Sequence, residues 1–109
     1  MRRVPAAVLG LAAALGFAWP AAHAQAKIED TMTKAGCLAC HTKDKKLVGP
    51  AYKDVAAKYK GQADAVAKLA EKVRKGSQGV WGPVPMPPTT PDKISDADLK
   101  AAIEWALKQ

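Results

Sequence analysis

Residues 37–41 read Cys37-Leu38-Ala39-Cys40-His41, and this pentapeptide holds both cysteines of the 109-residue chain. Two cysteines separated by two residues and followed directly by histidine are typical of the attachment site of c-type haem. In such a turn each thiol can form a thioether with one haem vinyl group, and the adjacent histidine lies beneath the iron as its fifth ligand. The motif therefore predicts one covalent haem on Cys37 and Cys40, with His41 as an axial ligand.

Two other interpretations of the cysteine pair are a thiol oxidoreductase and part of a zinc site. A structural zinc site needs four ligands, and the motif supplies only three. A chain this small also needs more than an ordinary hydrophobic core, such as disulfides, a metal or a cofactor. A disulfide across two intervening residues closes a loop too small to stabilise the fold much. Packing around a large apolar cofactor answers the size problem better, which favours haem.

The first 24 residues are predicted to be a secretory signal peptide. Arginines at positions 2 and 3 form a basic start, an uncharged apolar stretch covers 4–17, and residues 22–24 (Ala-His-Ala) form a cleavage site. The apolar stretch is shorter than the roughly 20 residues that a membrane-spanning helix needs, so a cleaved signal is preferred to a membrane anchor. The mature chain would be one exported domain, 25–109, and the sequence leaves Sec and twin-arginine export both open.

The chain is basic, with a formal net charge of +7 that includes the two arginines of the expected signal. Basic character can indicate nucleic-acid binding, but the lysines are interspersed with acidic residues and no run of aromatic side chains accompanies them. An exported protein also rarely meets nucleic acid. The charge therefore favours solvated helix faces and a basic docking surface for a protein partner.

Apolar periodicity predicts an all-α fold, because four stretches repeat with helical spacing and none alternates with period two. The last helix has the clearest start, since Ser95 followed by Asp98 is a capping-box pattern. The expected helices are a first one over 28–36 that runs into Cys37, a short one over 52–59, a third over about 63–75, and a last one after Ser95.

The segment 76–94 has no periodicity and contains five prolines and three glycines. Loops of this length in small domains tend to be functional or disordered. Disorder usually comes with low hydrophobicity, yet this loop includes Trp81 and Met86 among several apolar residues. Its prolines reduce the entropy lost on ordering. The composition predicts a stiff loop that presents a side chain.

The iron would need a sixth ligand, and His41 is the only histidine in 25–109. No third cysteine is present, so methionine remains, at Met32 and Met86. Met32 lies on the apolar stripe of the first helix, where core packing is the ordinary role. Met86 stands between prolines in the stiff loop, which can hold a weak thioether ligand in place. Met86 is therefore the expected ligand, and histidine-methionine ligation is typical of electron transfer.

The sequence resembles the small class I bacterial cytochromes c of the c-551/c-552 type. The resemblance implies a fold of four to five helices around one haem, and a soluble, monomeric, periplasmic one-electron carrier that is not an enzyme. It also implies redox protein partners, such as a bc-type complex, a terminal oxidase, a nitrite reductase or a peroxidase. The stretches that carry the resemblance are 36–41, 47–56, 76–83 and 85–88.

The resemblance further implies a supporting shell around the haem. The Pro50 carbonyl would accept a hydrogen bond from His41, the Trp81 indole would donate to a propionate, and Lys72 would lie near a propionate. Gly36 would let the first helix approach the last one closely, with Met32 and Trp105 at the contact. Two departures concern the loop: Thr89 replaces an asparagine that is frequent in relatives, and 89–93 is longer than usual.

A haem enzyme or gas sensor is the main alternative function. It would need an open or easily displaced sixth position with polar distal groups, and the sequence offers no distal histidine. In the electron carrier, transfer would pass through an exposed haem edge with an apolar rim. Rim lysines would steer the partner, and the expected ones are Lys34, Lys43, Lys45 and Lys46.

Overall fold

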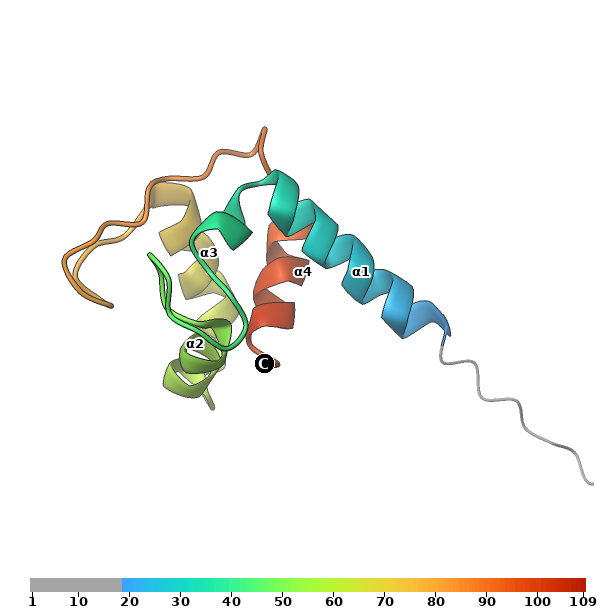
Figure 1. The fold of residues 1–109 in the computed structure, drawn as a ribbon, viewed down its shortest axis with the longest axis horizontal. Coiled ribbons are helices and arrows are strands. Elements are labelled where there is room, and N and C mark those ends of the chain that lie inside the picture. The colour runs from blue at the N-terminus through green and yellow to red at the C-terminus, as the bar shows by residue number, and fades with distance from the viewer. Residues whose placement is uncertain (1–18) are drawn as a thin grey trace, which may run out of the picture.

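A computed structural model describes residues 19–109, and its secondary structure is helical (Figure 1). The described residues contain no β-strand, only two isolated bridges, and the predicted all-α class is confirmed. Residues 1–18 of the expected signal peptide lie outside the described part. The elements are α1 (Trp19–Lys34), the 3₁₀-helix η1 (Cys37–Ala39), α2 (Tyr52–Tyr59), α3 (Ala65–Lys75) and α4 (Asp96–Ala106).

The helix α4 is the centre of the fold, since it contacts α1, α2 and α3. Its first turn is capped as predicted, with the Asp98 backbone N–H donating to Ser95 Oγ at 3.2 Å. A serine cap of this kind contributes about 1 kcal/mol. The apolar stripe that follows is buried on the inner face of the helix, and it consists of Leu99, Ala102, Ile103, Trp105 and Ala106.

The α1–α4 contact is formed by the expected pair, because Met32 and Trp105 are both buried in one apolar cluster. Figure 1 shows α1 passing over α4, and the two helices are in contact. The expected role of Gly36 is wrong, since a Cβ atom there would meet nothing within 4 Å. Gly36 instead has a φ of 85°, a left-handed value that glycine adopts at helix ends. It ends the turn after α1, so that Cys37 starts η1 rather than continuing the first helix.

The short helix α2 fixes the segment that follows the cysteine motif. The first backbone N–H groups of a helix lack partners within it. Here the N–H of Tyr52 donates to the Thr42 carbonyl at 2.9 Å and that of Lys53 to the Lys43 carbonyl at 3.1 Å. The start of α2 is therefore tied to the residues directly after His41.

The helix α3 begins at Ala65, two residues after the predicted start, and Gly76 ends it. Only Ala65 is fully buried, whereas the apolar stripe of Val66, Leu69, Ala70 and Val73 is half-buried. Within residues 19–109 no helix is both long and apolar enough to cross a membrane.

Candidate haem site

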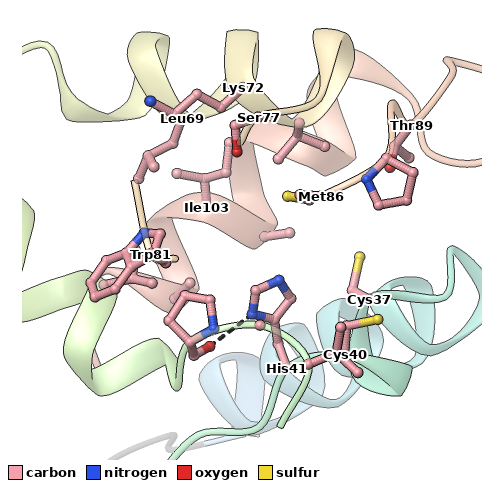
Figure 2. A pocket seen from close by; sticks show the side chains of 18 of the residues that line it. Cys37, Cys40, His41, Leu69, Lys72, Ser77, Trp81, Met86, Thr89 and Ile103 are labelled. Carbon is pink, nitrogen blue, oxygen red and sulfur yellow. Dashed lines mark hydrogen bonds between the residues drawn. The ribbon is translucent and has the colours of Figure 1, made fainter. Parts of the chain in front are cut away.

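A cavity of about 400 Å³ lies between η1, α3, α4 and the loop 76–94. Two residues of the apolar stripe of α3, Leu69 and Val73, line it, which explains why that stripe is only half-buried. Figure 2 shows the side chains around this cavity. The cavity is lined by every site residue expected from the sequence, namely Cys37, Cys40, His41, Pro50, Lys72, Trp81 and Met86.

The 3₁₀-turn of η1 directs both cysteines to the cavity. The backbone N–H of His41 donates to the Cys37 carbonyl at 3.0 Å, and that of Cys40 donates to the same carbonyl at 3.2 Å. Cys37 and Cys40 are both half-buried, and both carry free thiols. Burial raises the pKa of the Cys37 thiol, whereas reactive redox cysteines have a lowered pKa. The raised pKa of Cys37 is thus unlike that of a thiol-exchange cysteine.

The His41 ring is held on three sides. Its Nδ1 atom lies 2.8 Å from the Pro50 carbonyl oxygen, which identifies Nδ1 as the donor and leaves Nε2 available to a metal. The Tyr52 ring stacks on it, with ring centroids 5.2 Å apart and planes inclined by 21°. Gly49 closes the third side, because an added Cβ would lie 2.8 Å from Nδ1 and 2.9 Å from Nε2.

The Met86 backbone is fixed by Ser77 in an isolated antiparallel bridge. The Met86 N–H donates to the Ser77 carbonyl at 2.8 Å, and the Ser77 N–H donates back at 3.1 Å. In Figure 2 the Met86 sulfur points into the cavity on the side facing His41. Met32 also borders the cavity, but it is 3% exposed and belongs to the cluster around Trp105.

Trp81 and Lys72 line the cavity on the side away from the two cysteines in Figure 2. Trp81 is 38% exposed at the rim, and the Lys58 ammonium lies 5.0 Å from its ring centroid. Lys72 comes from the last turns of α3. The cavity lining on this side therefore includes one indole and one ammonium group, and both are donors that suit carboxylates.

Residue Thr89, which departs from the pattern of relatives, is held through its backbone. Its N–H donates to the Val73 carbonyl at 2.8 Å, and its carbonyl accepts from Arg74 Nη1 at 3.2 Å. Thr89 lines the cavity and is half-buried. The segment that begins at Thr89 is thus anchored to α3.

Sequence reasoning missed several residues that support the site. From the sequence, Tyr52 is expected only as the start of the helix over 52–59, and Gly49 only as part of the stretch 47–56 that carries the resemblance. The one available signal is the Gly49-Pro50 pair eight residues after His41, since a glycine there could have indicated that the backbone comes close to the His41 ring. The contacts of Ser77, Lys58 and Arg74 had no local signal, because their partners lie far away along the chain.

The residues around the cavity fit haem. Two thiols lie one turn apart, an imidazole has its Nδ1 occupied by a carbonyl, and a thioether sulfur faces it across an apolar space. Lys72 and the Trp81 indole, which both line the cavity, match the propionates of the porphyrin. When bound, haem supplies an iron that accepts and releases one electron.

A family model described as cytochrome c matches residues 25–108. The chain belongs to the cytochrome c family. Cytochrome c2 of Rubrivivax gelatinosus is 59% identical over 76 residues, which are 70% of this chain and 89% of that protein. Cytochrome c-551 of Pseudomonas aeruginosa is 57% identical over 74 residues, or 68% of each chain.

Solved structures agree with the sequence relatives. The crystal structure of Nitrosomonas europaea cytochrome c552 matches with a TM-score of 0.68 at 50% identity, and the match covers 73% of this chain and 96% of that one. The protein is therefore a small class I c-type cytochrome with the fold expected from the sequence, and it carries covalently bound haem c. It takes part in electron transfer with redox partners, as cytochromes c do.

Proposed function

We propose that this cytochrome is a periplasmic one-electron carrier whose haem is attached through Cys37 and Cys40 and whose iron is ligated by His41 and Met86. The observation that carries the proposal is the opposed arrangement of the His41 ring and the Met86 sulfur across one apolar cavity. Histidine-methionine ligation raises the reduction potential, which suits a carrier between respiratory donors and terminal acceptors.

The surrounding residues support this ligation in distinct ways. The Pro50 carbonyl fixes the tautomer and plane of the His41 ring. The Ser77 bridge holds the Met86 backbone, so little entropy is lost when the neutral sulfur binds. At the rim, Trp81 would donate to one propionate and Lys72 would lie near a propionate, which balances negative charge where the cavity opens.

A haem enzyme or gas sensor is the competing function. Such a protein keeps a distal position open and lines it with polar groups that bind or activate a ligand. The distal side here presents Met86 between prolines, so the sixth position would be filled by a side chain of the protein itself. This arrangement favours outer-sphere electron transfer, without catalysis by the protein itself.

Partner docking is proposed at the apolar rim beside the cavity, where Val48, Trp81 and Val84 are exposed. The partners would be a bc-type complex, a terminal oxidase, a nitrite reductase or a peroxidase. Of the lysines expected to steer them, two are engaged elsewhere: Lys34 pairs with Asp30 at 2.9 Å and Lys43 with Glu29 at 2.9 Å. Lys45 and Lys46 form no ion pair within the described residues and are the better candidates.

The periplasmic location is supported by the match of the family model, which begins at Gln25 where the signal peptide is expected to end. Mass spectrometry of the exported protein tests both points. We expect one haem added to a chain that begins at Gln25, and the haem should stay with the polypeptide on acid-acetone extraction. Extractable haem would contradict covalent attachment, and a retained N-terminus would contradict the cleaved signal.

The ligand assignment is tested by replacing each methionine separately. In Met86→Ala the sulfur-to-iron charge-transfer band of the ferric protein should disappear, the potential should fall, and external ligands should bind. Met32→Ala is the matched control, because it also borders the cavity but should keep the band. Loss of the band in Met32→Ala with retention in Met86→Ala would refute the assignment.

A further inference from the structure

The Arg74 side chain joins three segments of the chain. It lies in the last turn of α3 and is 19% exposed. Its Nη1 donates to the Thr89 carbonyl at 3.2 Å, and its Nη2 donates to the Ile94 carbonyl at 2.8 Å and to Asp96 Oδ1 at 2.7 Å. One guanidinium therefore holds both ends of the segment 89–94 and the first residue of α4.

The two carbonyl bonds matter more than the ion pair. The Asp96 side chain is 90% exposed, and exposed ion pairs contribute little because water screens them. The carbonyls of Thr89 and Ile94 belong to irregular backbone, which needs partners from elsewhere. Bonds from a charged donor are stronger than neutral ones. A planar guanidinium can reach several acceptors at once, whereas a lysine ammonium is a compact point charge.

The position of Thr89 connects this cluster to the iron ligand. Thr89 lies three residues after Met86, and its N–H is bonded to Val73 on the same turn of α3 as Arg74. The Ser77 bridge holds Met86 itself, and the Arg74 bonds hold the chain that leaves it. This second anchor spans the segment that is longer than usual in this chain.

We propose that Arg74 is a positioning residue that keeps Met86 on the iron, by fixing the segment 89–94 against α3. The inference rests on the proposed ligation by Met86. Without the guanidinium, the segment gains freedom and the Met86–iron bond opens more often. An external ligand then competes more effectively for the sixth position.

Imidazole binding to the ferric holoprotein measures this opening directly. In Arg74→Leu the apparent affinity for imidazole should rise about tenfold, which corresponds to about 1.4 kcal/mol of lost preference for the closed loop. The charge-transfer band should weaken in parallel. Arg74→Lys keeps the positive charge but lacks the planar guanidinium that donates to both carbonyls. Its affinity for imidazole should therefore lie between those of the wild type and Arg74→Leu.

Two matched variants separate positioning from charge. Lys75→Leu removes the neighbouring positive charge, whose partner is the exposed Glu71 on the same helix, and should leave imidazole affinity unchanged. Asp96→Asn removes the ion pair but keeps both carbonyl bonds, and its affinity should stay near the wild-type value. If Arg74→Leu binds imidazole no better than Lys75→Leu does, the proposal is overturned.

Failure of this inference is distinguishable from failure of the ligand assignment. If Met86→Ala loses the band while Arg74→Leu and Arg74→Lys keep wild-type imidazole affinity, Met86 is the ligand and Arg74 does not position it. If Met86→Ala keeps the band, the ligand assignment itself is wrong and the inference is overturned with it. Should Arg74→Leu fail to accumulate as holoprotein, Arg74→Lys decides: raised imidazole affinity supports the proposal, and unchanged affinity overturns it.

Discussion

Gly76 lies so close to Met86 that a Cβ atom on the glycine would be 2.7 Å from the Met86 carbonyl oxygen. Gly76 also has a φ of 79°, a value that side chains with a Cβ rarely adopt. The residue that ends α3 therefore lies against the Met86 backbone, in the middle of the loop 76–94, at a position where only glycine fits. The backbone of the expected ligand depends on this contact as well as on the Ser77 bridge.

The first prediction compares two glycines with the same positive φ. Gly61 also has a φ of 79°, but an added Cβ there meets nothing within 4 Å. Gly61→Ala should cost about 1–2 kcal/mol of unfolding free energy from backbone strain alone. Gly76→Ala should lose more stability and should also shift the Met86 charge-transfer band. Denaturant unfolding and the ferric spectrum check this, and equal effects of the two variants would contradict it.

The second prediction concerns the close contact between Gly49 and the His41 ring. In Gly49→Ala the ring must move away from the added methyl group, which lengthens the bond to the Pro50 carbonyl. That bond makes the imidazole a stronger electron donor, so weakening it should raise the reduction potential. Voltammetry of the holoprotein measures the shift. The charge-transfer band should persist, and an unchanged potential would show that the ring is not held by this contact.

The third prediction addresses the indole N–H of Trp81. Trp81→Phe keeps an aromatic ring at the rim but removes the donor, so it should cost about 1 kcal/mol of holoprotein stability if that donor binds a propionate. Lys58→Gln is the control, because it removes the cation over the same ring and keeps the N–H. Unfolding free energies of the two holoproteins check the prediction. An effect in Lys58→Gln alone would assign the contribution to the cation.

The fourth prediction divides the lysines by their partners. Replacing Lys45 and Lys46 by glutamine should lower the rate of electron transfer to an acidic redox partner and flatten its dependence on salt, because the Debye length falls from about 10 Å at 0.1 M to about 3 Å at 1 M. Lys43→Gln should instead destabilise the fold. Its ammonium pairs with Glu29 and lies 5.3 Å from the Trp105 ring centroid. Stopped-flow rates and unfolding curves distinguish the two effects, and a salt-independent wild-type rate would exclude steering.

Features with a local cause were predictable from the sequence. The cap at Ser95 depends on residues three positions apart, and it was predicted correctly. Helical spacing predicts an apolar stripe of Leu99, Ala102, Ile103, Ala106 and Leu107; the first four are buried, whereas Leu107, just after the end of α4, is only partly buried. The cysteine motif likewise sets its own turn. Gly36 was misassigned because close packing and a left-handed turn both require glycine, and a sequence does not separate the two.

Features that depend on distant partners were not predictable. Lys43 was expected on the docking rim, yet its charge is paired with Glu29 across the fold. Trp105 was expected at the contact with Met32, and the structure adds the Tyr52 ring, in an edge contact at 5.6 Å. The Arg74 bonds span 15 to 22 residues of sequence. No periodicity or motif encodes such pairs, because they arise only when the helices pack.

The two sides of the cavity differ in how they are built. The His41 ring is backed by Tyr52 and then Trp105, which sit in helices, whereas Met86 sits in irregular backbone held by a few hydrogen bonds. Segments of the second kind open at the lowest free energy in native proteins. With the proposed ligation by His41 and Met86, we expect partial unfolding of this cytochrome to have a preferred order, in which the sulfur leaves first while the imidazole side keeps its native structure. The fold would then set which of the two proposed axial bonds is the exchangeable one.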